Sequence, residues 1–160
     1  MAVTIRSAAP HDCGTILRFI RELAEYEREP DAVEATGEML ATALFSTPPA
    51  AEAVIAERDG TPIGFALFFH NFSTWAGKRG LYLEDLYVTP TARGSGAGKA
   101  LLAHLAGLAL DRGCARFEWA VLDWNTPAID FYRAMGAQAM DEWTVQRVTG
   151  DALVRLAGRG

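Results

Sequence analysis

The most informative segment of the sequence is Val88-Thr89-Pro90-Thr91-Ala92-Arg93-Gly94-Ser95-Gly96-Ala97-Gly98-Lys99. It follows a β-rich run, turns at a proline, carries three alternating glycines and opens a long helical pattern. Glycines let backbone N–H groups approach a ligand without an intervening side chain, and a helix N-terminus adds unpaired N–H donors with positive partial charge. The stretch therefore predicts a cradle for a pyrophosphate at a strand-to-helix turn.

Three known phosphate-binding sequence patterns resemble this loop. A P-loop needs glycine at position 93 and a hydroxyl side chain at position 100, where Arg93 and Ala100 stand. The dinucleotide pattern G-x-G-x-x-G needs a third glycine at position 99, which is Lys99. The pattern R-x-x-G-x-G is met by Arg93, Gly96 and Gly98. The alternative to all three is a glycine turn that only reverses the chain.

Around the loop, apolar periodicity predicts alternating helices and strands. Strands are expected over 3–5, 53–56, 63–69, 81–88, 117–122 and 143–148, and helices over 15–27, 39–44, 101–109 and 128–135. Asp59-Gly60 predicts a hairpin between the second and third strands, and residues 71–80 read as a polar loop. No repeat or linker divides the chain, so residues 1–160 are expected to form one α/β domain with a central sheet flanked by helices.

Composition narrows the class of protein. Half of the 160 residues are hydrophobic and 22% are charged, as in a globular protein. A net charge of −5 argues against a nucleic-acid partner, and no apolar run has the length of a membrane helix. The two cysteines, Cys13 and Cys114, show no metal-ligand spacing, so we expect no metal and a cytoplasmic location with reduced thiols.

The chain resembles the GCN5-related N-acetyltransferase (GNAT) family over nearly its whole length, through the R-x-x-G-x-G loop and the order of its elements. Further runs resemble the diamine and thialysine acetyltransferases, the spermidine/spermine group; they are residues 21–27, 81–88, 122–125, and 131–132 with 136–137. The resemblance implies the GNAT fold, a mixed, mostly antiparallel sheet with a glycine-rich pyrophosphate loop. It also implies an acetyl-CoA-dependent N-acetyltransferase that acts as a homodimer on a small cationic amine, a thialysine-like amino acid or a diamine.

The resemblance also implies which residues contact acetyl-CoA. Backbone groups of β-rich residues before the loop would pair with the pantetheine arm and polarise the acetyl carbonyl, and the loop itself would hold the pyrophosphate. Asn125 and Ala128 would also contact the cofactor. The full cofactor-binding set is Leu86, Tyr87, Val88, Arg93, Gly94, Ser95, Gly96, Ala97, Gly98, Lys99, Asn125 and Ala128.

For catalysis, the resemblance implies that Tyr132 protonates the departing CoA thiolate and that Glu84 binds the amine and helps to remove its proton. The substrate-binding set is Tyr26, Glu27, Glu84, Asp85, Trp75 and Glu142. Adjacent residues in a regular strand point to opposite faces, so only one of Glu84 and Asp85 can easily face the substrate unless a bulge intervenes. Which of the two handles the proton stays open. Glu22, Glu25 and Glu29 read as a solvated helix face.

Two other functions remain compatible with the same pattern. One is acetylation of a protein lysine or N-terminus, which needs an open groove in place of a closed acidic pocket. The other is a non-catalytic acetyl-CoA-binding module. The presence of both Tyr132 and Glu84 argues against the module, because cofactor binding alone requires neither.

Overall fold

A computed structural model describes residues 2–160. The chain consists of two units, one ending at Leu122 and one spanning Asp123–Gly160. No helix in residues 2–160 combines the length and the apolar character that crossing a membrane requires.

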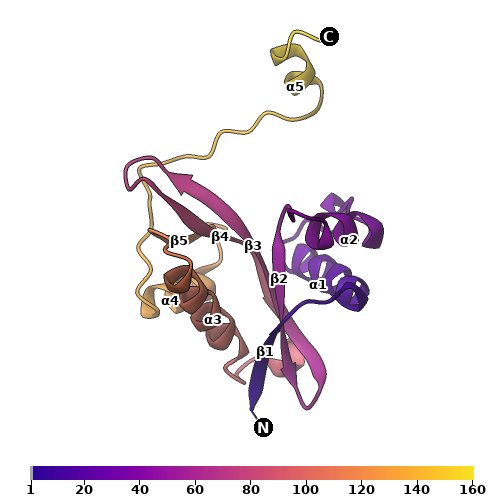
Figure 1. Cartoon of the computed structure of the whole chain (residues 1–160), viewed down its shortest axis with the longest axis vertical. Helices are drawn as coiled ribbons and strands as arrows, with labels where there is room; N and C mark the ends of the chain where they lie inside the picture. The colour runs from indigo at the N-terminus through magenta and orange to yellow at the C-terminus, as the bar shows by residue number, and fades with distance from the viewer. Residues whose placement is uncertain (1) are drawn as a thin grey trace. The chain divides into compact units, whose positions relative to one another are not determined.

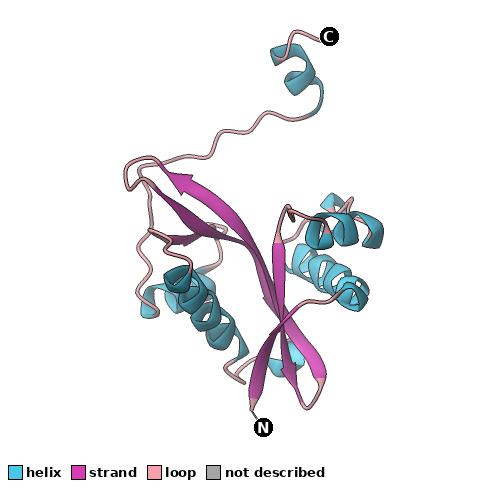
Figure 2. Ribbon diagram, viewed as in Figure 1, coloured by secondary structure: helices cyan, strands magenta, loops and turns pink. Residues whose placement is uncertain are grey.

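The first unit is built on a sheet whose strands follow one another in chain order (Figure 2). They are β1 (Val3–Ser7), β2 (Glu52–Arg58), β3 (Thr61–Ser73), β4 (Lys78–Val88) and β5 (Phe117–Trp119). Pairing is antiparallel from β1 to β4, and β5 runs parallel to β4. The parallel step follows from the helix that connects β4 to β5, since parallel neighbours need a crossover connection.

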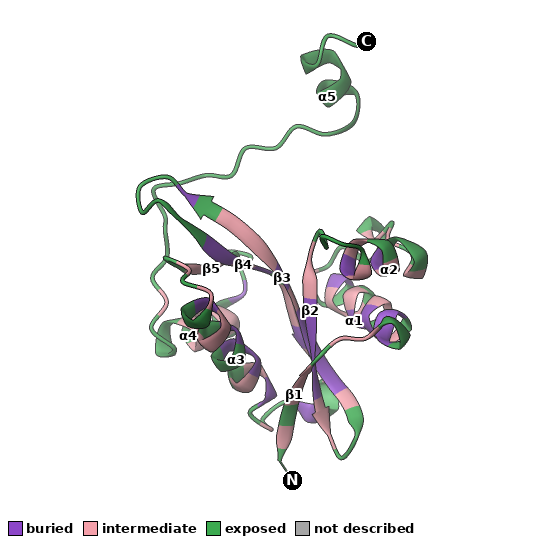
Figure 3. Ribbon diagram, viewed as in Figure 1, coloured by how far each residue is buried: buried purple, intermediate pink, exposed green. Residues whose placement is uncertain are grey.

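Helices cover both faces of this sheet (Figure 1). Helices α1 (Cys13–Tyr26) and α2 (Gly37–Phe45) lie on one face and α3 (Ala97–Asp111) on the other, with 3₁₀ turns at Pro10–Asp12, Pro30–Ala32 and Pro90–Ala92. The α1 side is closed by Phe19, whose ring stacks on that of Phe65 at 5.8 Å between centroids. Leu101 and Leu105 of α3 are fully buried as well. Figure 3 shows that the buried residues of α1, α2 and α3 lie on the sides of these helices that face the sheet.

The start of α1 is fixed by a buried carboxylate. Asp12 accepts two hydrogen bonds from the Arg6 guanidinium, at 2.7 and 2.8 Å, and one from the Ala9 N–H at 2.7 Å. The hydrogen bond from Arg6 is the main reason that the pKa of Asp12 is lowered to about 2. Through these three hydrogen bonds Asp12 joins β1 to the start of α1.

The β3–β4 hairpin is longer than the sequence predicts. Residues 71–80 read as a polar loop, but β3 runs to Ser73 and β4 starts at Lys78. Only four residues form the turn, in which Ser73 Oγ accepts from the Ala76 N–H at 3.2 Å. The expectation of a loop was wrong because polar side chains at the end of a hairpin face solvent while the backbone ladder continues.

Two other expectations at the C-terminal side need correction. The strand expected over 117–122 ends at Trp119, and residues 143–148 form no strand. The apolar alternation in 143–148 satisfies the pattern, but a strand also needs a partner for its N–H and C=O groups. The second unit instead contains α4 (Thr126–Ala134), close to the expected helix over 128–135, and α5 (Gly150–Leu156), which the sequence did not predict.

Candidate active site

The glycine loop joins β4 to α3 in the expected order. Gly94 and Gly96 have φ angles of 84° and 85°, in the left-handed region that favours glycine, and α3 begins at the next residue, Ala97. The turn is held by the Ser95 N–H, which donates to Ala92 O at 3.2 Å, and by Ser95 Oγ, which accepts from the Ala97 N–H at 3.4 Å. The first turn of α3 thus starts directly at the loop, with N–H groups that have no intrahelical acceptor.

Strand β4 parts from its parallel neighbour just before the loop. The pairing between β4 and β5 ends at Leu83 and Trp119. Beyond it, residues up to Val88 pair with β3 on their other side. A backbone edge is therefore left without a β5 partner over the segment that contains Leu86, Tyr87 and Val88. An edge of this kind can form backbone hydrogen bonds with an extended ligand, as it would with an added strand.

A β-bulge sits at this point of divergence. Leu83 pairs with Phe68 and Asp85 pairs with Leu67, which leaves Glu84 as one extra residue on β4. The sequence allowed for a bulge at the Glu84-Asp85 pair, and the register shows that the extra residue is Glu84.

The bulge changes which side chains share a face. Tyr82 is opposite Phe69 and Asp85 is opposite Leu67, two β3 residues on one face of that strand. Leu67 packs against the core under α1 and α2, so Tyr82 and Asp85 both lie on the α1 side of the sheet. In a regular strand, two residues three positions apart would lie on opposite faces.

Two other carboxylates, Glu84 and Glu27, act on Asp85, which lies on this face. Burial, then the charges of Glu84 and Glu27, raise the pKa of Asp85 to about 6. Burial also raises the pKa of Glu27. Burial, Glu84 and Glu118 raise the pKa of Tyr82. A carboxyl group whose pKa lies close to neutrality is suited to accept and return a proton at physiological pH. We call Glu27, Glu84 and Asp85 the acidic cluster.

The end of α1 carries two of the expected substrate-binding residues. Tyr26 is the last residue of α1, and Glu27 caps the helix with its N–H on Leu23 O at 2.9 Å. Helix α1 packs against β4, and the charge of Glu27 contributes to the raised pKa of Asp85. Glu27, Glu84 and Asp85, three of the expected substrate residues from two distant parts of the chain, are therefore electrostatically coupled.

Glu22 was predicted to be a solvated residue of the helix face, and the structure gives it a specific partner. Its Oε1 accepts a hydrogen bond from the Tyr87 hydroxyl at 2.8 Å, so Glu22 is not an ordinary solvated residue. Tyr87 is 5% exposed. Burial, together with the hydrogen bond to Glu22, raises the pKa of Tyr87 to about 12. The signal in the sequence was the tyrosine itself, because a buried hydroxyl needs a partner.

Trp75 does not join the acidic cluster. It lies in the turn between β3 and β4 and is 91% exposed. Asp85 is seven residues beyond the start of β4 at Lys78, which at about 3.3 Å per residue is roughly 23 Å along the strand. A small amine bound at Asp85 would not reach Trp75 of the same chain.

The remaining expected residues belong to the second unit. Asn125 caps α4, its Oδ1 accepting from the Ala128 N–H at 3.4 Å. Tyr132 lies on α4, half-buried, with its ring 5.7 Å from that of Phe131. Glu142 is exposed in an irregular segment. The cofactor and catalytic roles of these residues stay predictions.

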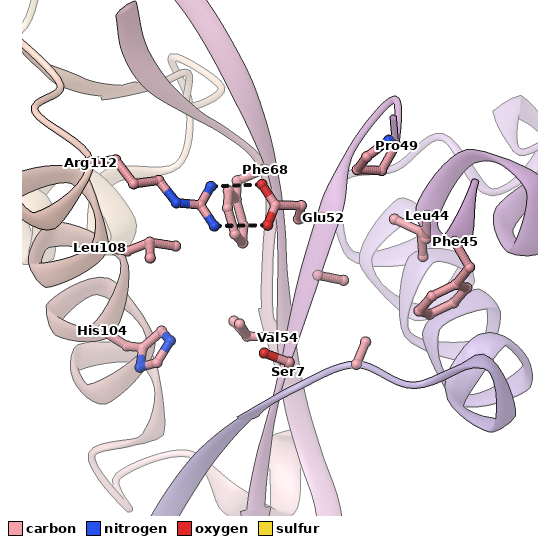
Figure 4. A pocket seen from close by; sticks show the side chains of 12 residues that line it. Ser7, Leu44, Phe45, Pro49, Glu52, Val54, Phe68, His104, Leu108 and Arg112 are labelled. Carbon is pink, nitrogen blue, oxygen red and sulfur yellow. Dashed lines mark hydrogen bonds and ion pairs between the residues drawn. The ribbon is translucent and has the colours of Figure 1, made fainter. Parts of the chain in front are cut away.

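A cavity of about 240 Å³ lies elsewhere in the first unit (Figure 4). Its wall carries the Arg112–Glu52 ion pair, with N–O distances of 2.7 and 2.9 Å. The hydrogen bond from Arg112 is the main reason that the pKa of Glu52 is lowered. None of the residues expected to bind cofactor or substrate lines this cavity. In residues 2–160 no group of three His, Cys, Asp or Glu side chains is arranged to hold a metal ion.

Comparisons with known proteins identify the family of this chain. The model of the acetyltransferase (GNAT) family matches residues 16–137. Thialysine N-epsilon-acetyltransferase of Bos taurus is 43% identical over 98% of both chains. L-ornithine N5-acetyltransferase of Arabidopsis thaliana is 32% identical over 93% of this chain and 85% of its own. An integron cassette protein of V. cholerae has a structure that superposes with a TM-score of 0.81 at 30% identity over 98% of both chains. By sequence and by fold, the chain belongs to the GNAT acetyltransferase family and is an N-acetyltransferase.

Proposed function

We propose that this protein, as a single functional domain over residues 1–160, transfers the acetyl group of acetyl-CoA to the primary amine of a small cationic substrate. The preferred class is a lysine-like amino acid such as thialysine, followed by diamines. The observation that carries this proposal is the acidic cluster beside the β4 bulge, which offers negative charge to an ammonium group. The names of the relatives from Bos taurus and Arabidopsis thaliana, both acetyltransferases of amino-acid side-chain amines, support the same class.

Acetyl-CoA would lie along the first unit from the β4 edge to the start of α3. The edge at Leu86–Val88 that has no β5 partner suits the amide groups of the pantetheine arm, and residues 93–99 suit the pyrophosphate. Bound there, acetyl-CoA supplies an activated acyl group as a thioester. Asn125 and Ala128 complete the proposed cofactor set, and Tyr132 is the proposed proton donor to the thiolate.

The acidic cluster would bind the amine and remove its proton. A lysine-like amine has a pKa of about 10.4, so bringing it to the neutral form at pH 7 costs roughly 4.6 kcal/mol. Asp85 can accept that proton, because its pKa of about 6 leaves it mostly ionised at pH 7 yet more basic than an ordinary aspartate. Glu84 is exposed at the bulge and would hold the ammonium group as it arrives. This division of roles gives the proton transfer to Asp85 in preference to Glu84.

Gly96→Val should weaken acetyl-CoA binding by about 10- to 30-fold, the upper range for an anion at a helix N-terminus. The φ angle of Gly96 is 85°, which a β-branched residue does not adopt without strain, so the loop would change shape. Calorimetric titration of the folded variant measures the effect. Gly107→Ala is the control: an added Cβ there meets nothing within 4 Å, so we expect unchanged binding and slightly higher stability. Unchanged affinity in Gly96→Val would remove the loop from the proposed site.

A turnover assay by thiol release, across amines, amino acids and peptides, tests the substrate class. A thioether two carbons from the amine lowers the pKa of that amine by induction, so more thialysine than lysine is neutral at pH 7. We therefore expect a higher kcat/KM for thialysine than for lysine and little turnover of peptides. Equal values for thialysine and lysine, or a preference for peptide lysines, would contradict this assignment.

We also propose a cytoplasmic homodimer. Residues 138–160 are all exposed and include the large apolar side chains Trp143, Val145 and Leu156. Exposed apolar side chains in such number are typical of an interaction surface. Light scattering at micromolar concentration should give twice the 17.3 kDa mass of the chain; a monomer mass would contradict the proposal. Cys13 and Cys114 are both free thiols, which is compatible with a reducing compartment.

A further inference from the structure

The arginine of the glycine loop points back toward α1. The Nε of Arg93 donates to Val88 O at 3.2 Å. Its Cζ lies 5.4 Å from the centroid of the Tyr26 ring and 5.9 Å from that of the Tyr87 ring. Both distances are within the range of cation–π attraction. Arg93 therefore links the start of the cofactor loop to the last residue of α1.

The last turn of α1 is held to β4 at two neighbouring points. Glu22 and Tyr26 are four residues apart and so share one face of the helix. Glu22 accepts the hydrogen bond from the Tyr87 hydroxyl at 2.8 Å, and Tyr26 lies under the Arg93 guanidinium. Tyr87 is the penultimate residue of β4, and Arg93 is hydrogen-bonded to Val88, the last residue of β4. The orientation of this turn thus depends on Tyr87 and Arg93.

The acidic cluster depends on the same turn. Glu27 follows Tyr26 directly and is fixed by the helix end through its N–H on Leu23 O. Asp85 lies on β4, two residues before Tyr87 on the same face of the strand. Any rotation of the last turn of α1 would therefore move Glu27 relative to Asp85.

We propose that Arg93 is a positioning residue for the amine substrate: through Tyr26 it fixes the end of α1, and with it Glu27, against the acidic face of β4. The inference rests on the proposed function, in which Glu27, Glu84 and Asp85 bind the amine. It assigns to the arginine of the R-x-x-G-x-G pattern a role in substrate binding in addition to its place beside the pyrophosphate.

Arg93→Lys tests this role. Lysine keeps the positive charge near the loop but lacks the planar guanidinium and the Nε–H group. We expect KM for thialysine to rise by about 2- to 30-fold, the range that a lost cation–π contact spans. The Kd for acetyl-CoA, measured by calorimetry, should rise less than the amine KM, because the positive charge beside the loop is kept. In a Tyr26→Leu background the same substitution should no longer change the amine KM, because Arg93 acts through Tyr26.

Arg112→Lys is the matched control. Arg112 also lies over an aromatic ring, that of Phe68 at 5.9 Å, and is ion-paired, but it caps the end of α3 that is remote from the loop. We expect it to lower Tm without changing the amine KM. An unchanged amine KM with a raised acetyl-CoA Kd in Arg93→Lys would overturn the inference, as would an equal effect in the Tyr26→Leu background. Absence of turnover in the wild-type protein would contradict the proposed function and the inference together.

Discussion

Tyr132→Phe is expected to lower kcat by about 10²- to 10⁴-fold, the range for a lost general acid. The departing CoA thiolate has a thiol pKa near 8.5, so it leaves more readily when a proton is supplied in the transition state. The substitution removes one oxygen and keeps the ring, so the packing against Phe131 should survive. The affinity for acetyl-CoA should change little. Steady-state rates and calorimetry on the same preparation separate these effects.

Tyr82→Phe is the control for the loss of a tyrosine hydroxyl. Tyr82 lies on the acidic face of β4 with its ring 5.3 Å from that of Phe69, and the proposed mechanism gives its hydroxyl no proton to transfer. We expect its kcat within about twofold of wild type, far outside the range for a general acid. If Tyr132→Phe keeps more than about half of the wild-type kcat, Tyr132 is structural and another group protonates the thiolate.

Asp85→Asn is expected to have a similarly large effect on catalysis, about 10²- to 10⁴-fold in kcat/KM at pH 7 to 8, since it removes the proposed proton acceptor. In the wild-type protein the low-pH limb of kcat/KM should fall near pH 6, the pKa of Asp85. That limb should be absent in the variant. Glu84→Gln should retain the limb but move it to lower pH, because one of the negative charges that raise the pKa of Asp85 is gone.

Asp85→Asn should also make the protein more stable at high pH. Asp85 has a pKa of about 6 in the folded chain against 3.8 for the unperturbed group, so the folded state holds this proton more tightly. Ionisation of Asp85 therefore costs the folded state up to about 3 kcal/mol above pH 6, and this cost disappears below pH 4. We expect Asp85→Asn to raise Tm at pH 8 and to leave Tm unchanged near pH 4. A lower Tm at both pH values would show that Asp85 is a stabilising residue.

Local patterns predicted most of the fold and named the residues of the candidate site. The order of β4, loop and α3 follows from Pro90 and the glycines, since these residues favour few backbone conformations. The hairpin at Asp59-Gly60 forms as expected between β2 and β3. The strand expected over 143–148 does not form, because alternation describes a face and does not supply a neighbouring strand.

The arrangement of the site depends on long-range contacts that no local pattern contains. The neighbouring carboxylates Glu84 and Asp85 were evident from the sequence, but the register of β3 decides that the extra residue is Glu84. The contact between Glu22 and Tyr87 joins residues 65 positions apart. Likewise, the charge of Glu27 acts on Asp85 only because α1 packs beside β4.

The bulge at Glu84 makes the number of residues in β4 as important as their identity. Removing Glu84 would restore regular alternation and leave Leu83 opposite Phe68 and Asp85 opposite Leu67, so every later residue would keep its side of the sheet. Removing Leu86 instead would turn Tyr87 toward α3 and bring Val88 under α1. A deletion at Glu84 therefore removes the bulge without exchanging the two faces of the strand. Tolerance to a one-residue deletion should be higher at Glu84, which is exposed, than at Leu86.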